Sequence, residues 1–173
     1  MYELIKKTTS LLSIIIGCAV SAALIVSFAK GFDIETFGKG LYPSYTHVYD
    51  ILGKLSEADM GQYRLLILLD SLFAVAHGLT CAFIIVYLFD VKTVKGGLAR
   101  KLVLLPMGTM VLDLCENCLS FIILAAHPEK TFVAHIIGTV TLTKWTVVGL
   151  NYTAIVCGLV WFVVFILTSQ RAS

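Results

Sequence analysis

Three acidic residues interrupt long apolar stretches of the sequence, where ionised side chains are rare. Asp70 lies within residues 65–89, and Asp113 and Glu116 lie within residues 102–126. If these stretches cross a bilayer, a charge near its centre costs at least about 2.5 kcal/mol. Acids kept at such a cost typically bind a cation, a proton or a polar head group, so these three residues are the first candidates for chemistry.

Other polar residues share helical faces with these acids. On the stretch 102–126 they recur every three or four residues and form one stripe: Thr109, Asp113, Glu116, Asn117 and Ser120. On the neighbouring stretches the polar residues are seven apart, which also places them on one face: Asp70 with His77, and Lys144 with Asn151. Three of the four apolar stretches therefore have a polar face.

The depths of these residues indicate that the three faces meet. At about 1.5 Å of rise per residue, Glu116, Asp70 and Asn151 lie about 10–13 Å below the outer ends of their helices. Lys144 lies at the outer edge and can reach inward with its stem. A deeper tier holds two residues: His77 and Asp113. We predict a polar pocket, in which the acids either join the helices as paired groups or stay partly ionised to bind a ligand.

The composition places the whole chain in a membrane. The 173 residues are 58% hydrophobic and 14% charged, with a mean hydropathy of +0.92, whereas soluble domains carry about 25% charged residues. A soluble enzyme domain, a disulfide-rich module and a disordered chain are thereby excluded. Four stretches have the roughly 20 residues that a span needs: 10–29, 65–89, 102–126 and 145–168. We predict an all-α fold, a four-transmembrane-helix bundle with a single membrane domain over residues 1–173.

Local patterns predict how the helices begin and end. From Ser44 onwards, apolar residues recur at helical spacing, which indicates a short amphipathic helix in the first outer loop, on the bilayer surface or as a lid. Ser56 and Asp59 form a capping box for the second helix, and Pro128 is expected to end the third. The polar segment 132–143 is expected to extend the fourth helix or to form a short helix. Small residues at intervals of four predict close packing of the first helix: Ser13, Gly17 and Ser21.

Basic residues are biased to one side of the predicted bundle. The two terminal tails and the loop 90–101 hold seven basic and two acidic residues, and the opposite side holds six of each. Because basic residues near the ends of spans stay in the cytoplasm, both termini are predicted to be cytoplasmic. The net charge of +2 gives no basis for nucleic-acid binding.

The five cysteines all fall within the predicted spans, which argues against a fold held by outer-loop disulfides. Cys115 and Cys118 form a C-x-x-C motif, but membrane thiol oxidoreductases with this motif also need a cysteine pair in an outer loop. We expect these thiols to fill small spaces between helices. None of the four histidines has metal-ligand spacing to the cysteines, so neither a metal nor a cofactor is predicted.

Two resemblances rest on these residues. The chain resembles a family of small uncharacterised four-helix integral membrane proteins. The likeness is carried by a D-x-x-E-N pattern on the third helix, formed by Asp113, Glu116 and Asn117. Further matches lie around it: Pro106, His127, Pro128, Glu129, Lys144, Trp145, Tyr63, Arg64 and Asp70. At fold level it is also similar to emopamil-binding, sterol-isomerase-like proteins. That similarity implies a lipid-accessible pocket to which these residues would contribute: Asp70, His77, Glu116, Trp145 and Asn151.

Three functions are compatible with the sequence. The first is a structural or accessory subunit, or an assembly protein, within a larger membrane complex or a homodimer. The second is binding of a lipid or an amphiphilic amine, with its head on Asp70 and Glu116, which as an enzyme would shift a double bond between two carboxyls. The third is transport of a small solute or a proton, which would need a dimer because four helices are few for a carrier. Because the pattern for catalysis is weak, a role other than that of an enzyme is favoured.

Overall fold

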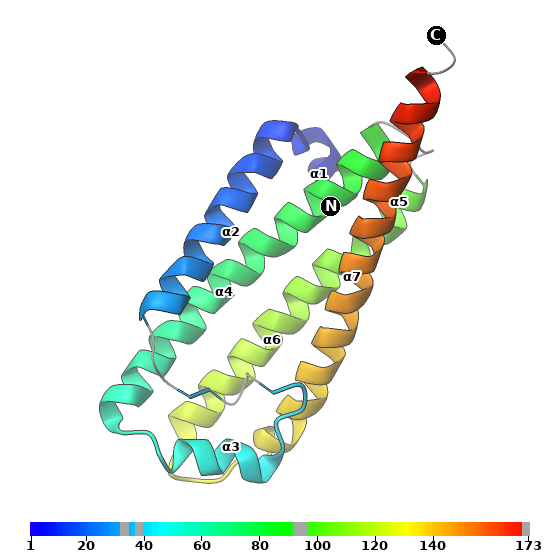
Figure 1. Ribbon diagram of the computed structural model, residues 1–173. Coiled ribbons are helices and arrows are strands. Elements are labelled where there is room, and N and C mark those ends of the chain that lie inside the picture. Colours follow the sequence, from blue (N-terminus) through cyan, green and yellow to red (C-terminus); the bar gives the residue numbers. More distant parts are fainter. Residues whose placement is uncertain (32–34, 37–39, 92–96, 171–173) are drawn as a thin grey trace.

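The chain folds into four long helices that run side by side, with shorter helices at their ends (Figure 1). The structure, a computed structural model, describes all residues except 32–34, 37–39, 92–96 and 171–173. The long helices are α2 (Leu11–Gly31), α4 (Glu57–Val86), α6 (Leu104–Ala126) and α7 (Val133–Gln170). Each belongs to a helical stretch that is long and apolar enough to cross a membrane, and the described residues contain no β-strand. The expected all-α bundle of four transmembrane helices is confirmed.

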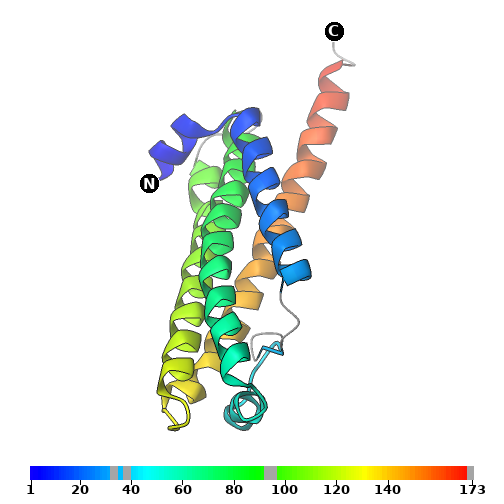
Figure 2. The same cartoon turned by 90° about the vertical axis from the view of Figure 1, so that its left-hand side faces the viewer.

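Short helices mark the two ends of the bundle. At one end lie α1 (Tyr2–Thr8) and α5 (Gly97–Leu102), together with the π-helical segment η2 (Tyr87–Val91) that continues α4. At the opposite end lies α3 (Tyr45–Leu52), and this is termed the α3 end. Both chain termini lie at the first end, termed the terminal end (Figures 1 and 2). That the terminal end faces the cytoplasm stays a prediction.

Two of the long helices begin earlier than hydropathy alone indicates. α4 starts directly after the predicted capping box, in which the Ser56 hydroxyl accepts a hydrogen bond from the Asp59 N–H and the Asp59 carboxylate accepts one from the Ser56 N–H. α7 starts at Val133 instead of residue 145, so the polar segment before the fourth span extends that helix. α6 ends before Pro128, as predicted. Polar side chains lower the hydropathy of a first turn, but they do not interrupt its backbone hydrogen bonds.

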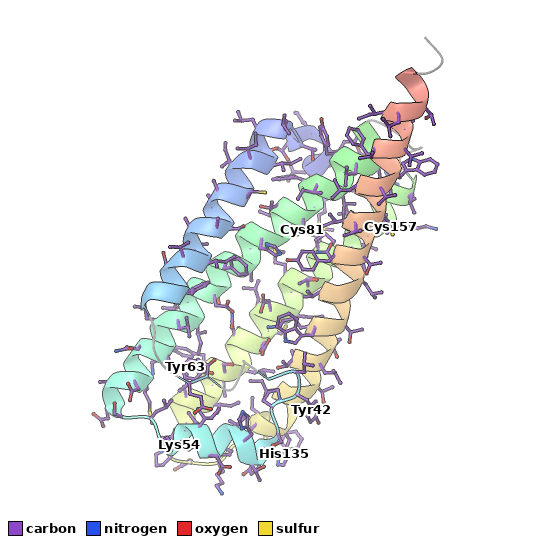
Figure 3. All side chains as sticks on the ribbon, viewed as in Figure 1. Tyr42, Lys54, Tyr63, Cys81, His135 and Cys157 are labelled. Carbon is purple, nitrogen blue, oxygen red and sulfur yellow. The ribbon has the colours of Figure 1, made fainter. Side chains whose placement is uncertain are left out.

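Apolar side chains form a buried cluster at each end of the bundle. The cluster at the terminal end joins α1, α4, α5, α6 and α7, and it includes Ile5, Ile85, Ala99, Val103 and Ile155. The cluster at the α3 end joins α3, α4, α6 and α7, and it includes Val48, Leu52, Tyr63, Ile123 and Ile137. Figure 3 marks both levels on α4, with Tyr63 toward the α3 end and Cys81 toward the terminal end. The polar faces of the helices therefore lie between two apolar layers.

The amphipathic helix α3 closes its end of the bundle. Its apolar face is buried against α4, α6 and α7 through three residues: Val48, Ile51 and Leu52. The Tyr49 hydroxyl accepts a hydrogen bond of 2.6 Å from the Thr131 N–H, and the Tyr45 ring stacks on His135 with 4.1 Å between centroids (Figure 3). The expectation that this face rests on the bilayer surface is therefore wrong, because protein and not lipid covers it.

α2 packs against α4 through the predicted strip of small residues. A Cβ atom added at Gly17 would overlap the Thr80 side chain, and Ser21 is buried. The Thr80 hydroxyl is itself held by the Ala76 carbonyl at 2.7 Å, so it cannot easily give way. Most other side chains of α2 are exposed. The position of α2 therefore depends on this close approach to α4.

Gly17→Leu is expected to destabilise the protein by about 1–3 kcal/mol, because the new side chain would overpack the α2–α4 contact. The matched control is Gly149→Leu on α7, where an added Cβ meets no atom within 4 Å. Thermal unfolding of the purified variants in detergent, followed by circular dichroism, measures both effects. An equal loss of stability in the two variants would show that α2 does not depend on a close approach at Gly17.

Candidate functional site

A cavity of about 540 Å³ lies among the four long helices, and we call it the central cavity. It is lined by seven of the residues that the sequence placed in a polar pocket: Asp70, His77, Asp113, Glu116, Asn117, Lys144 and Trp145. Aromatic residues form much of the remaining wall: Phe28, Tyr63, Phe73 and Tyr152. The polar faces of α4, α6 and α7 thus meet around a space rather than in a dry contact.

Lys144 carries the positive charge of the site and joins α7 to α6. Its Nζ donates to Asp113 Oδ1 at 3.0 Å and pairs with Glu116 Oε2. Thr141, one turn earlier on α7, donates to Glu116 Oε1 at 2.8 Å. The three charged side chains are at most 15% exposed, so little water screens the ion pairs. Removing one partner from such a buried pair typically costs about 3–5 kcal/mol.

Asp70 joins α4 to α6 through an amide. Asn117 Nδ2 donates to Asp70 Oδ2 at 3.0 Å and to the Ser71 hydroxyl at 3.2 Å. Within the described part of the chain, no basic side chain lies within 4.0 Å of the Asp70 carboxylate. Asp70 therefore differs from Asp113 and Glu116, because its carboxylate accepts a hydrogen bond from a neutral amide and not from the lysine.

His77 links α4 to α7 on the side of the cavity toward the terminal end. Its Nε2 shares a hydrogen bond of 2.8 Å with the Tyr152 hydroxyl, and its ring stacks on Phe73 at 5.1 Å between centroids. The Cys81 Sγ lies 3.6 Å from the same nitrogen. His77 and Asp113, the two residues of the predicted deeper tier, both line the cavity. Their hydrogen-bond partners differ: His77 pairs with Tyr152, and Asp113 pairs with Lys144.

Asn151 is the expected site residue that does not line the cavity. It is 2% exposed and buried, whereas its neighbour Tyr152 lies on the cavity wall. Asn151 therefore lies against packed helices instead of open space, although it is two turns beyond Lys144 on the same face of α7. Lys144 itself lies about 16 Å along α7 from Val133, and not at the outer edge, because the helix begins earlier than expected.

The aromatic wall of the cavity was missed by sequence reasoning. Phe73 and Tyr152 both contact His77, one from the same helix and one from α7. The one available signal is the spacing of Phe73, which lies four residues before His77 and so on the same face of α4. Aromatic residues are common in apolar spans, and nothing in the sequence separates those that face lipid from those that face the cavity.

None of the protein-family models, curated proteins or solved structures compared with the chain matches it. The resemblance carried by the D-x-x-E-N pattern and the similarity to emopamil-binding proteins therefore stay predictions. Function is to be inferred from the geometry of the central cavity.

Glu116→Leu is expected to destabilise the protein by about 1–3 kcal/mol, because it removes the acceptor for Thr141. The loss is below that of a fully broken buried pair, since Lys144 keeps Asp113 as a partner. Glu116→Gln keeps the shape and the acceptor oxygen, so its effect on stability should be small. Thermal unfolding of both variants and the wild type in one detergent measures the difference. Identical melting temperatures for all three proteins would contradict the buried network.

Proposed function

We propose that the central cavity binds an amphiphile with a cationic head group, such as a hydrophobic amine. The observation that carries this proposal is the Asp70 carboxylate, which lines the cavity without a basic partner among the described residues. Its Oδ2 is held by Asn117, which leaves Oδ1 for a ligand. A charge-assisted hydrogen bond to an ammonium group is roughly twice as strong as a neutral one.

The charge balance of the cavity also favours a cation. Three carboxyl groups face one ammonium group, so the formal charge is −2 when all are ionised and His77 is neutral. Lys144 pairs with Asp113 and Glu116, so one excess negative charge stays with that group and the other lies at Asp70, on α4. A ligand ammonium beside Asp70 would bring the charge of the site closer to neutrality.

The walls of the cavity suit an apolar body attached to that head. Phe73, Tyr63 and Trp145 offer ring faces, which attract cations and pack against hydrocarbon. A volume of about 540 Å³ lies within the range of ligand pockets, about 300–1,000 Å³. The site thus combines a few polar groups with mostly apolar walls, as small-molecule sites do.

Access from the bilayer is consistent with the exposure of the lining residues. Trp145 and Tyr152 line the cavity and are nonetheless 44% and 46% exposed. Both belong to α7, so the cavity opens past this helix at membrane depth. An amphiphile dissolved in the bilayer would reach Asp70 by moving sideways between helices, without passing through water.

Asp70→Asn is expected to weaken binding of a long-chain alkylamine by at least about tenfold, because the amide cannot balance an ammonium charge. The probe is dodecylamine, titrated into purified protein in a neutral detergent, with thermal shift and calorimetry as readouts. Asp50→Asn, at an exposed site on α3, is the matched control and should bind as the wild type does. Dodecanol should bind more weakly than the amine to the wild type.

Equal binding of dodecylamine to the Asp70→Asn variant and the wild type would contradict the proposal. Equal affinity of the wild type for the amine and the alcohol would contradict it too, since the cavity would then select for chain length alone. Circular dichroism of Asp70→Asn checks that the variant is folded. We expect it to fold, because the new side chain still offers an oxygen to the Asn117 amide.

A second candidate function is that of an accessory subunit, and the terminal half of α7 favours it. Most residues there are about half exposed, whereas Gly158 and Phe162 face the rest of the protein. The exposed residues are Leu159, Val160, Trp161, Val163, Val164 and Phe165. Figure 2 shows this half of α7 standing away from the other helices. A partner helix from a larger complex or from a second copy would cover it.

The accessory role predicts that the protein leaves the membrane in a larger assembly. Extraction of the full chain in a mild detergent, followed by size-exclusion chromatography with light scattering, gives the mass of the protein part. A mass above that of one chain is expected. Migration as a lone monomer that still binds the amine would contradict the accessory role and leave the ligand-binding proposal standing.

A further inference from the structure

A second cavity lies at the α3 end, and we call it the end cavity. Its volume is about 540 Å³, and six residues line it: Glu57, Met60, Arg64, Leu124, His127 and Pro128. The first three belong to the opening turns of α4, and the others belong to the last turn of α6 and the residues that follow it. No residue lines both the end cavity and the central cavity, so the two sites are separate.

Three polar groups of the end cavity have no partner among the described residues: the exposed side chains of Glu57 and Arg64, and a buried nitrogen of His127. Glu57 and Arg64 are seven residues apart on one face of α4, and neither forms an ion pair within 4.0 Å with another described residue. His127 Nδ1 is buried without a hydrogen-bond partner. Buried polar atoms are paired in the great majority of proteins, so this nitrogen calls for a partner from outside the chain.

The end cavity lies at the level of lipid head groups. Glu57 and Arg64 belong to the polar first turns of α4, ahead of its apolar span, and His127 follows directly after α6. Helices that cross a bilayer place such residues at the boundary between hydrocarbon and water. Met60 and Leu124 add an apolar wall to the charged groups. A molecule that is always present at this level, with both charges and an apolar body, is a glycerophospholipid.

We infer that the end cavity binds the head group of a phosphatidylethanolamine. The phosphate would contact the Arg64 guanidinium, whose planar donors match phosphate oxygens, together with an N–H at His127 Nδ1. The primary ammonium would contact the Glu57 carboxylate. Basic pockets between transmembrane helices bind the phosphates of anionic lipids, and here Glu57 adds a carboxylate beside the arginine.

The Glu57 carboxylate determines which lipid head group the end cavity favours. Phosphatidylglycerol would leave Glu57 without a cation, and phosphatidylserine would place a second carboxylate near it. A choline head group carries no N–H for the carboxylate, and it is favoured by aromatic cages. The described residues that line this cavity include no Phe, Tyr or Trp. Glu57 with Arg64 therefore matches a zwitterion whose cation can donate hydrogen bonds.

The test is binding of short-chain phosphatidylethanolamine to the delipidated full-length protein in a neutral detergent, measured by native mass spectrometry and thermal shift. Phosphatidylcholine and phosphatidylglycerol with the same chains should bind at least about fivefold more weakly. Arg64→Gln should weaken binding of all three lipids, and Glu57→Gln should remove the preference for ethanolamine over glycerol. Lys54→Gln, which removes an exposed charge just after α3 (Figure 3), is the control and should change nothing.

Several outcomes would overturn the inference. Equal binding of the three lipids to the wild type, or an unchanged preference in Glu57→Gln, would contradict the head-group assignment. Competition by inorganic phosphate as strong as that by the lipid would identify a simple anion site instead. If Arg64→Gln does not fold, Arg64→Lys keeps the charge, loses the planar donors and should still weaken binding. Asp70→Asn should still bind phosphatidylethanolamine, because Asp70 does not line the end cavity. The lipid proposal and the amine proposal can therefore fail independently of each other.

Discussion

The contact of Lys144 with Asp113 and Glu116 is the interaction on which the middle of this bundle depends. Within a bilayer, apolar surfaces gain nothing by leaving lipid for protein, so helices associate through close packing and polar contacts. Here polar contacts connect each pair among α4, α6 and α7. α6 and α7 are joined by the lysine, α4 and α6 by Asp70 with Asn117, and α4 and α7 by a histidine–tyrosine pair. Three helices are thus linked in all three combinations at the level of the central cavity.

The apolar clusters at the two ends explain why the middle can hold a cavity. At the α3 end, α3 fills the space between the helices with Val48, Ile51 and Leu52. At the terminal end, α1 and α5 contribute Ile5 and Ala99 to a second cluster. The helices are held at both ends, so their polar faces need not collapse onto one another. The resulting arrangement keeps carboxyl groups beside open space, which is what a binding site for a charged head group requires.

Much of this fold could be read from the sequence, because the signals for it are local. A capping box at Ser56, a proline after α6 and a strip of small residues around Gly17 each act within a few residues, and the structure contains all three. The polar stripe of α6 was also visible, since helical spacing alone places its members on one face. The clustering of the acids with Lys144 followed from the few ways in which polar faces can be buried in a membrane.

The remaining features depend on how helices cross, which no local pattern records. Asn151 lies outside the cavity and Tyr152 lies on its wall, because the orientation of α7 in the bundle decides which of two consecutive residues faces the cavity. The burial of α3 depends on the gap left by three helices at their ends. The end cavity combines residues from the start of one helix and the end of another, 57–64 and 124–128, and only the packed structure brings them together. The length of α7 has a consequence for the membrane itself. Its 38 residues extend for about 57 Å, and the apolar part from 145 to 168 alone extends for about 36 Å, against a hydrocarbon layer of about 30 Å. Such a helix matches a thick bilayer when nearly upright, and it has to tilt in a thin one. Hydrophobic mismatch therefore couples the tilt of α7 to the thickness of the bilayer, independently of any ligand.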